Sequence, residues 1–329
     1  MRSLLFSLLL LGPLATFARA QDSAPSAQEL LNKLVTSLKT ENYAGDFTWE
    51  FGSRVESFRL VHTVIDAKET EKLYRLTGSE IEFLRSSPSA TCGTLGGRLL
   101  AGGELSSSDG QHFGVNDNYR MSVVGSDRIA GRPAWLVNIL PMDEDRYGVL
   151  LAVDQGNGLL LRLVVFDAQK RSGLERLQFV SMTSGIDPNT YVSGVKNEKP
   201  LIEVTPQQCV GDRVSLASAS HWKPTWLPSG YVMTNSSYSD DDGYMETYTD
   251  GLSSFSLFVR PTPAGAGGGY GRIERHFDMR GAALRLISFL PLEQDPVLVT
   301  VVGEIPLQTA QKISRSVRRV AVDPPPPEH

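Results

Sequence analysis

Residues 46–64 have the sequence DFTWEFGSRVESFRLVHTV, and this stretch decides the fold. Phe47, Trp49 and Phe51 fall on one face of an extended segment, with polar residues between them. Phe58 and Leu60 begin a second segment with the same alternation. A period of two is typical of β-strands with one buried face. The stretch therefore predicts two neighbouring strands of a sheet whose inner face is apolar.

The rest of the first half of the chain continues this pattern. Further strand-like runs, separated by turn signals, are residues 73–77, 81–85, 119–125, 134–140, 147–154, 159–167 and 175–182. One helix precedes them at residues 26–39, with a capping box formed by Ser26 and Glu29. Its leucines recur at helical spacing and form one apolar stripe. Many antiparallel strands and one long helix predict a strongly curved sheet around the helix, with a concave apolar cavity.

A second block of strands lies near the C-terminus. Its strand-like runs are residues 231–237, 245–249, 255–260, 273–279, 284–289 and 297–302, and a helix is expected at 306–317. Residues 183–220 show little periodicity and carry three prolines, so we interpret them as a linker. We expect domains at 21–182 and 221–320, followed by a proline-rich tail at 321–329.

The first twenty residues have the pattern of an export signal. Arg2 precedes an apolar run at 4–11, and Ala18-Arg19-Ala20 fits a cleavage site after Ala20. We expect residues 1–20 to be removed and the remaining chain to be exported; an uncleaved anchor is the alternative. Cys92 and Cys209 would then meet oxidising conditions, which permit a disulfide between them. Two buried free thiols are the other possibility.

Composition and motifs point away from several classes of protein. The 329 residues have a formal net charge of −5, which argues against nucleic-acid binding. The sequence contains no nucleophile elbow, no zinc-binding histidine pair and no Cys-x-x-Cys motif. We therefore expect no enzyme, no metal and no cofactor. A hydrolase assembled from scattered acidic residues remains a third hypothesis.

Four ordered segments resemble the RseB/MucB family of periplasmic regulators of sigma-E (AlgU) activity. They are WKPTWLPSGY at 222–231, YTDGLSSFSL at 248–257, VTVVGEIP at 299–306 with Thr309-Ala310, and RIAGRP at 128–133 followed by DRYG at 145–148. The likeness extends from about Leu30 to Arg318. It implies an α+β, mostly β fold: an N-terminal unclosed β-barrel over helices, similar to LolA and LolB, and a smaller C-terminal α+β domain.

The resemblance also implies a function. Members of the family bind the periplasmic region of a membrane-anchored anti-sigma factor of the RseA/MucA type and protect it from regulated proteolysis. Lipopolysaccharide or a related acyl lipid is thought to release the regulator. The alternative is a periplasmic carrier of lipids or lipoproteins, and homo-oligomerisation stays open.

Candidate site residues are assigned to lipid binding and to partner binding separately. We expect the lipid cavity to be lined by Phe47, Trp49, Phe51, Phe58 and Leu60, although a shift of one residue in register would turn them to the other face. Ordinary sheet core is the other interpretation of this set. For the partner surface we expect Trp226, Asp250, Gly251 and Phe255. Structural roles are the competing interpretation of these four, as a core anchor and a turn.

Overall fold

The computed structural model describes residues 25–66, 68–79, 81–86, 117–189, 222–239, 243–262, 275–291 and 296–320. The predicted signal peptide, Cys92, Cys209, most of the predicted linker and the proline-rich tail lie outside these ranges. The disulfide therefore stays a prediction. Within the described ranges, no helix is long and apolar enough to cross a membrane.

A ten-stranded antiparallel sheet forms the N-terminal half. Its strands are β1 (Tyr43–Phe51), β2 (Arg54–Ile65), β3 (Lys68–Arg75), β4 (Glu82–Ser86), β5 (Tyr119–Ile129), β6 (Arg132–Pro141), β7 (Gly148–Asp154), β8 (Leu160–Asp167), β9 (Ser172–Phe179) and β10 (Thr183–Ser184). The order is β4-β3-β2-β1-β9-β8-β7-β6-β5, and β10 pairs with β1. Among the described strands the path ends at β4 and β5, so the sheet is unclosed.

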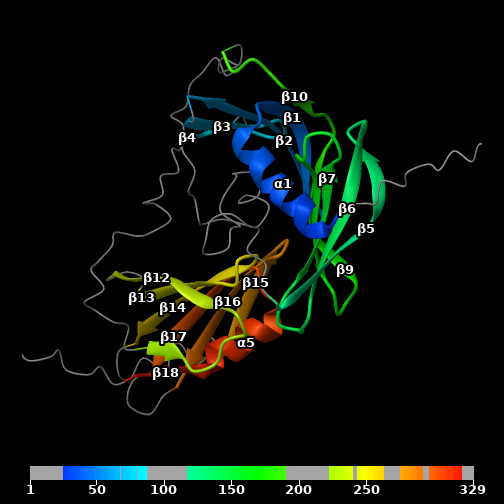
Figure 1. Ribbon diagram of the computed structural model, residues 1–329. Coiled ribbons are helices and arrows are strands. Elements are labelled where there is room, and N and C mark those ends of the chain that lie inside the picture. Colours follow the sequence, from blue (N-terminus) through cyan, green and yellow to red (C-terminus); the bar gives the residue numbers. More distant parts are fainter. Residues whose placement is uncertain are drawn as a thin grey trace, which may run out of the picture.

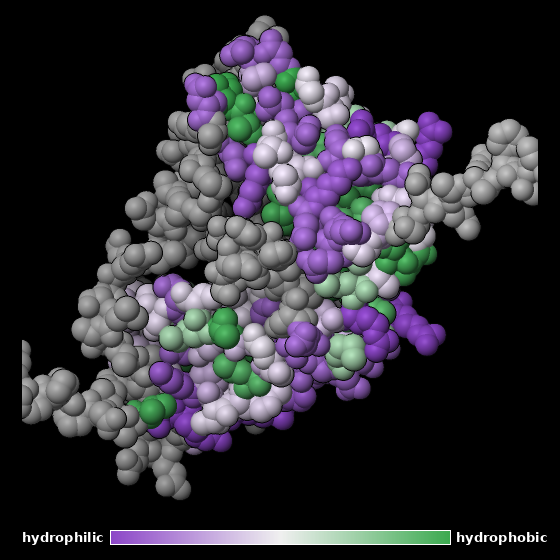
Figure 2. All heavy atoms as spheres, in the orientation of Figure 1, coloured by the Kyte–Doolittle hydropathy of each residue, from purple (hydrophilic) through white to green (hydrophobic). Residues whose placement is uncertain are grey.

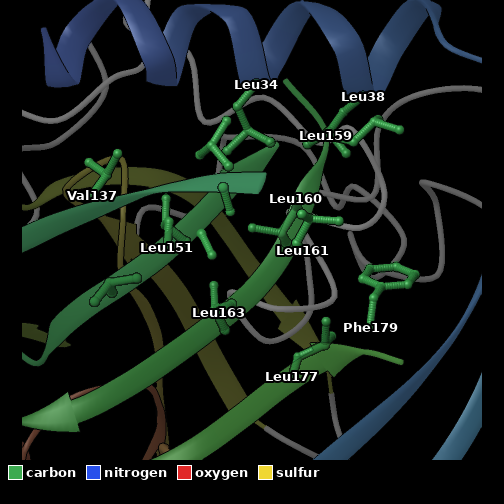
Figure 3. Close-up of a cluster of buried hydrophobic side chains, with 14 of the residues drawn as sticks. Leu34, Leu38, Val137, Leu151, Leu159, Leu160, Leu161, Leu163, Leu177 and Phe179 are labelled. Atoms are coloured by element: carbon green, nitrogen blue, oxygen red, sulfur yellow. The ribbon is translucent and has the colours of Figure 1, made fainter. Parts of the chain in front are cut away.

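Helix α1 (Ala27–Thr40) packs against the inner face of this sheet (Figure 1). Both hydrogen bonds of the predicted capping box between Ser26 and Glu29 are present. The helix directs Leu34 and Leu38 towards leucines of β7 and β8 and the preceding turn (Figure 3). The apolar alternation of the strands is thereby buried against the apolar stripe of the helix.

The C-terminal half contains a six-stranded sheet and one helix. Its strands are β12 (Val232–Ser239), β13 (Gly243–Thr249), β14 (Ser254–Pro261), β15 (Arg275–Arg280), β16 (Ala283–Leu290) and β17 (Val297–Gly303), in the order β12-β13-β14-β17-β16-β15. Helix α5 (Leu307–Ser316) covers one face through Ala310 and Ile313. A short pair, β11 (Trp222–Pro224) and β18 (Val317–Arg319), completes this half.

The predicted fold class is confirmed: the protein is mostly β, with an open sheet around a helix and a smaller α+β unit. Several boundaries differ from the expectation. β3 covers Lys68–Arg75 instead of 73–77, and β9 covers Ser172–Phe179 instead of 175–182. The last helix ends at Ser316, because Val317 adopts an extended backbone and begins β18. Its partner β11 has only three residues, which is too short for an alternation to predict it.

Candidate functional site

The predicted lipid-lining residues divide into two groups. Phe47, Phe58 and Leu60 lie deep in the core beneath α1, and each is at most 5% exposed. The rings of Phe47 and Phe58 stack 5.4 Å apart across β1 and β2. All three point to the inner face, as the alternation predicted. Their binding of lipid stays a prediction.

Trp49 and Phe51 lie at the other end of β1, next to the C-terminal half. The indole nitrogen of Trp49 donates a hydrogen bond of 2.8 Å to Glu175 Oε1 on β9. The guanidinium of Arg280, at the end of β15, lies 4.7 Å from the centroid of the Phe51 ring. These two aromatic residues therefore belong to a contact between the two halves of the chain.

Glu175 is the acidic residue at the centre of this contact. In the sheet register it lies between Val165 and Phe51, and it is only 3% exposed. The backbone N–H of Ala282, in the turn between β15 and β16, donates to Glu175 Oε2 over 3.3 Å. Burial raises the pKa of Glu175, although the hydrogen bonds and the charge of Arg280 oppose the shift.

The turn at residues 280–282 leaves no space for a larger residue. Gly281 has a φ of +62°, and a Cβ at this position would lie 2.6 Å from Glu175 Oε2 and 3.1 Å from Phe51 Cβ. Ala282 is completely buried within the N-terminal core. Only glycine combines this backbone conformation with so close an approach.

A second contact is formed by an ion pair between Arg146 and Asp250. Arg146 lies in the β6–β7 loop, and Asp250 follows β13; both side chains are completely buried. Arg146 Nε donates to Asp250 Oδ2 over 2.7 Å. The guanidinium also donates to Asp143 and to the carbonyl of Ser229. The pair therefore joins the two halves of the chain through a fully desolvated charge contact.

Two tyrosines enclose the guanidinium of Arg146. The ring centroids of Tyr119 and Tyr231 lie 5.7 and 5.1 Å from its central carbon. The hydroxyl of Tyr119 donates to Asp250 Oδ2 over 2.8 Å. Burial raises the pKa of both tyrosines well above the usual value, and the charge of Asp250 adds to the shift. Burial disfavours the charged Arg146, but the hydrogen bond and charge of Asp250 outweigh it and raise its pKa.

The remaining contact joins α5 to the same β6–β7 loop. Asp145 Oδ1 accepts from Lys312 Nζ over 2.9 Å and from Thr309 Oγ1 over 3.0 Å. Gln308 donates to the carbonyl of Glu144. This loop therefore contacts the C-terminal half both at its sheet and at its helix.

The residues predicted for the partner surface occupy different environments. Asp250 is in the buried ion pair, and Phe255 lies in the C-terminal core. Gly251 has a φ of +95° in the turn that carries Leu252 into the N-terminal core. Trp226 is half-buried, with Lys312 Nζ 5.2 Å from its ring. Contact of these residues with a partner stays a prediction.

Sequence reasoning missed Arg146, Tyr119 and Glu175. Two signals were available in the sequence. Arg146 lies in the DRYG segment that carried the family resemblance. Glu175 occupies an inward position of its strand, in phase with Leu177 and Phe179, where an acidic residue requires a partner. Among the described residues, no cluster of His, Cys, Asp and Glu side chains could hold a metal ion.

Two family models match the chain in succession. The MucB/RseB N-terminal domain matches residues 26–199, and the MucB/RseB C-terminal domain matches residues 216–318. The chain belongs to the MucB/RseB family. The contacts described above therefore join the N-terminal and C-terminal domains of a MucB/RseB protein.

Relatives in this family are similar over nearly their whole length. The sigma factor AlgU regulatory protein MucB of Pseudomonas aeruginosa is 29% identical, over 94% of this chain and 96% of its own. The sigma-E factor regulatory protein RseB of Escherichia coli is 25% identical, over 97% of this chain and 98% of its own. Both names describe regulators of sigma factors.

Solved MucB structures share the fold. MucB in complex with the periplasmic part of MucA has a TM-score of 0.68 and 25% identity, covering 90% of this chain and 99% of that one. A P. aeruginosa MucA/MucB complex gives a TM-score of 0.66, with 26% identity over 90% of this chain and 99% of the matched one. MucB alone gives 0.56, with 26% identity over 89% of this chain and 98% of that one.

Proposed function

We propose that this protein binds the periplasmic region of a membrane-anchored anti-sigma factor of the RseA/MucA type and protects it from regulated proteolysis. The observation that carries the proposal is the similarity to MucB in its complex with MucA, which extends over 90% of this chain. Both domains take part in that similarity. The protein acts by binding and not as an enzyme.

Lipopolysaccharide or a related acyl lipid is the proposed releasing signal. The N-terminal domain supplies an open sheet with an apolar inner face, to which Phe47, Phe58 and Leu60 contribute. Each buried CH₂ of an acyl chain contributes about 0.8 kcal/mol, so lipid binding needs no catalytic group. A lipid releases the partner only when it favours a state that binds the partner weakly.

The proposal includes a location and a division of the chain. We place the mature protein in the periplasm after loss of residues 1–20, with the lipid-binding domain at 21–182 and the partner-binding domain at 221–320. Residues 183–220 connect them. The matches to the N-terminal and C-terminal family domains support this division.

The test is a titration of the full mature chain with the periplasmic region of the anti-sigma factor from the same organism. Isothermal titration calorimetry should show saturable binding, and a protease assay should show slower cleavage of the bound region. Lipopolysaccharide micelles should then weaken the binding. Absence of binding would refute the proposal. Recovery of lipoproteins without an anti-sigma factor from envelope extracts would favour the carrier instead.

A further inference from the structure

Four exposed basic residues of the C-terminal domain gather around its short strand β18. Arg315 lies in the last turn of α5, Arg318 and Arg319 follow within β18, and Lys223 lies in the neighbouring β11. All four side chains are exposed to solvent. We call Lys223, Arg315, Arg318 and Arg319 the basic end. It brings together cations from two distant parts of the sequence.

Two of these cations lie directly opposite each other. Lys223 of β11 is the antiparallel partner of Arg318 of β18. Like charges at opposed positions of a sheet are destabilising. The guanidinium of Arg318 donates to the carbonyls of Arg315 and Val317 over 2.7 Å each, at the end of α5. A helix C-terminus favours cations, which accounts for Arg315 and Arg318 but not for Lys223. The fold therefore accepts a repulsive pair at this position.

Acidic residues of the same domain do not offset this charge at its surface. Of the four acidic residues in the described C-terminal domain, three are buried and the fourth pairs with Arg285: Glu246, Asp250, Glu304 and Asp278. Lys223 acts on Glu246 electrostatically, but burial raises the pKa of that carboxyl and so favours its neutral form. The surface around β18 is therefore predominantly positive.

The basic end also lies apart from the contact between α5 and the N-terminal domain. One turn before Arg315, Lys312 pairs with Asp145 of the β6–β7 loop over 2.9 Å. Within the described ranges, Lys223, Arg315 and Arg318 form no such ion pair. Figure 1 shows that β18 follows the end of α5 that points away from the N-terminal domain. The basic end is therefore directed towards solvent and not towards the other domain.

The charge of the whole chain limits how such a surface can meet an anionic partner. Loss of Arg2 and Arg19 with the predicted signal peptide changes the formal net charge from −5 to −7. An anionic surface repels a negatively charged protein as a whole, so approach requires the orientation that presents the basic end. Val320, next to Arg319, is 41% exposed and adds an apolar group suited to a membrane interface.

We propose that the basic end docks the mature protein on an anionic phospholipid bilayer. This contact uses headgroup charge and is separate from acyl-chain binding within the N-terminal domain. The choice of a bilayer over an acidic protein segment rests on the function proposed above, because a membrane-anchored partner keeps a bilayer close to the bound regulator. Docking raises the effective concentration of the regulator near its anchored partner without any new contact to it.

Sedimentation of the full mature chain with vesicles measures this docking. Vesicles of phosphatidylcholine with one-third phosphatidylglycerol should bind the protein, and vesicles of phosphatidylcholine alone should not. Raising the salt concentration from about 0.05 M to about 0.5 M should abolish the binding, because salt screens exposed charges. Equal binding to both kinds of vesicle, or no binding to the anionic ones at low salt, would overturn the inference.

Inorganic phosphate separates docking on a surface from a site for a single phosphate group. At equal ionic strength, phosphate should inhibit vesicle binding no more than chloride does, since screening depends on ionic strength. Stronger inhibition by phosphate would show that the basic end binds one phosphate group, and it would overturn docking on a bilayer.

The triple variant Lys223→Gln/Arg315→Gln/Arg318→Gln removes three cations of the basic end. Its partition coefficient on the anionic vesicles should fall by about a hundredfold, since each cation near an anionic surface contributes about fivefold. Relief of the repulsion between Lys223 and Arg318 should leave it at least as stable as the unmodified protein in thermal denaturation. The salt dependence of the unmodified protein tests the inference without any variant.

The matched control is Arg54→Gln/Arg120→Gln/Arg171→Gln. It removes three exposed arginines of the N-terminal domain and therefore the same net charge. Its partition coefficient should stay within about threefold of that of the unmodified protein, because charges beyond about 10 Å from the surface are screened. Equal losses in the two triple variants would show that only net charge matters, which would overturn the inference.

Calorimetry with the soluble periplasmic region of the anti-sigma factor separates docking from partner binding. The triple variant of the basic end should bind this soluble region as tightly as the unmodified protein does. A loss of affinity of about tenfold or more would make the basic end a partner contact and overturn the inference. If the unmodified protein binds anionic vesicles but not the soluble region, the proposed function fails and the electrostatic docking stands.

Discussion

The largest single effect should follow from Asp250→Ala. Asp250 Oδ2 accepts from Arg146 and Tyr119, and Oδ1 accepts from the backbone N–H groups of Leu252 and Ser253. Removing one partner of a buried ion pair costs about 3–5 kcal/mol, because the other charge stays buried. Asp143 and the carbonyl of Ser229 still accept from Arg146, so we expect a loss of about 3 kcal/mol, at the lower end of that range.

Urea denaturation followed by circular dichroism measures this loss. A loss of about 3 kcal/mol lowers the midpoint by about 1 M when the slope is about 3 kcal/mol per molar urea. Asp278→Ala is the matched control, because Asp278 forms a similarly short ion pair of 2.6 Å with Arg285, but both side chains are half-exposed. This variant should lose less than about 1 kcal/mol of unfolding free energy. In the double variant Arg146→Met/Asp250→Ala, the loss in the free energy of unfolding should be about 2 kcal/mol smaller than the sum of the losses in the two single variants. Additive effects, or a loss below about 1 kcal/mol for Asp250→Ala, would refute the reasoning.

Three further predictions concern local features. Gly281→Ala and its control Gly131→Ala both place a Cβ on a backbone with positive φ, but only the Cβ at 281 meets neighbouring atoms. Gly281→Ala should therefore lower the free energy of unfolding by about 1 kcal/mol or more beyond the loss in Gly131→Ala. Ser26→Ala removes the capping box of α1 and should cost about 1 kcal/mol, measured by thermal denaturation; no change would contradict the capping role. Burial raises the pKa of Glu175 above 4.5, so the folded state binds its proton more tightly than the unfolded state. The contribution of Glu175 to the free energy of unfolding should therefore fall as the pH rises from 4.5 through the raised pKa. Denaturation at a series of pH values should show the unmodified protein losing stability relative to Glu175→Gln over this range. Free energies of unfolding that run parallel with pH in the two proteins would contradict the prediction.

The elements of the fold were accessible from the sequence because they depend on local periodicity. The alternation at 46–64 predicted β1 and β2, and the structure pairs Phe47 with Phe58 as two inward-facing residues. The Ser26–Glu29 capping box predicted the start of α1 to within one residue. Short elements such as β11 and β18 escaped prediction, since three residues cannot establish a period.

The contacts between the domains were not accessible in the same way. Periodicity shows which face of a strand is buried but not what covers it. Arg146 and Asp250 are separated by 104 residues, and Glu175 and Ala282 by 107. The alternation placed Trp49 and Phe51 on one face of the strand, yet it could not show that the C-terminal domain covers this end of β1.

The surface of the protein shows why the internal contacts are informative. On the visible face, apolar residues form separate groups among polar ones (Figure 2). The larger apolar and charged features at the domain boundary are buried: Leu252, Ala282 and the Arg146–Asp250 pair. Substitutions at these buried positions should therefore lower the stability of the contact between the domains.

The Arg146–Asp250 ion pair at this boundary contributes more than stability. An apolar pair of similar volume in place of buried charges is often as stable or more stable, so stability alone does not account for Arg146 and Asp250. A guanidinium held between two tyrosine rings, with acceptors in fixed directions, favours one orientation of the domains over neighbouring ones. The two segments involved, DRYG and YTDGLSSFSL, are also segments that carry the family resemblance. The pair therefore specifies one defined orientation of the two domains, which loosely joined domains would lack.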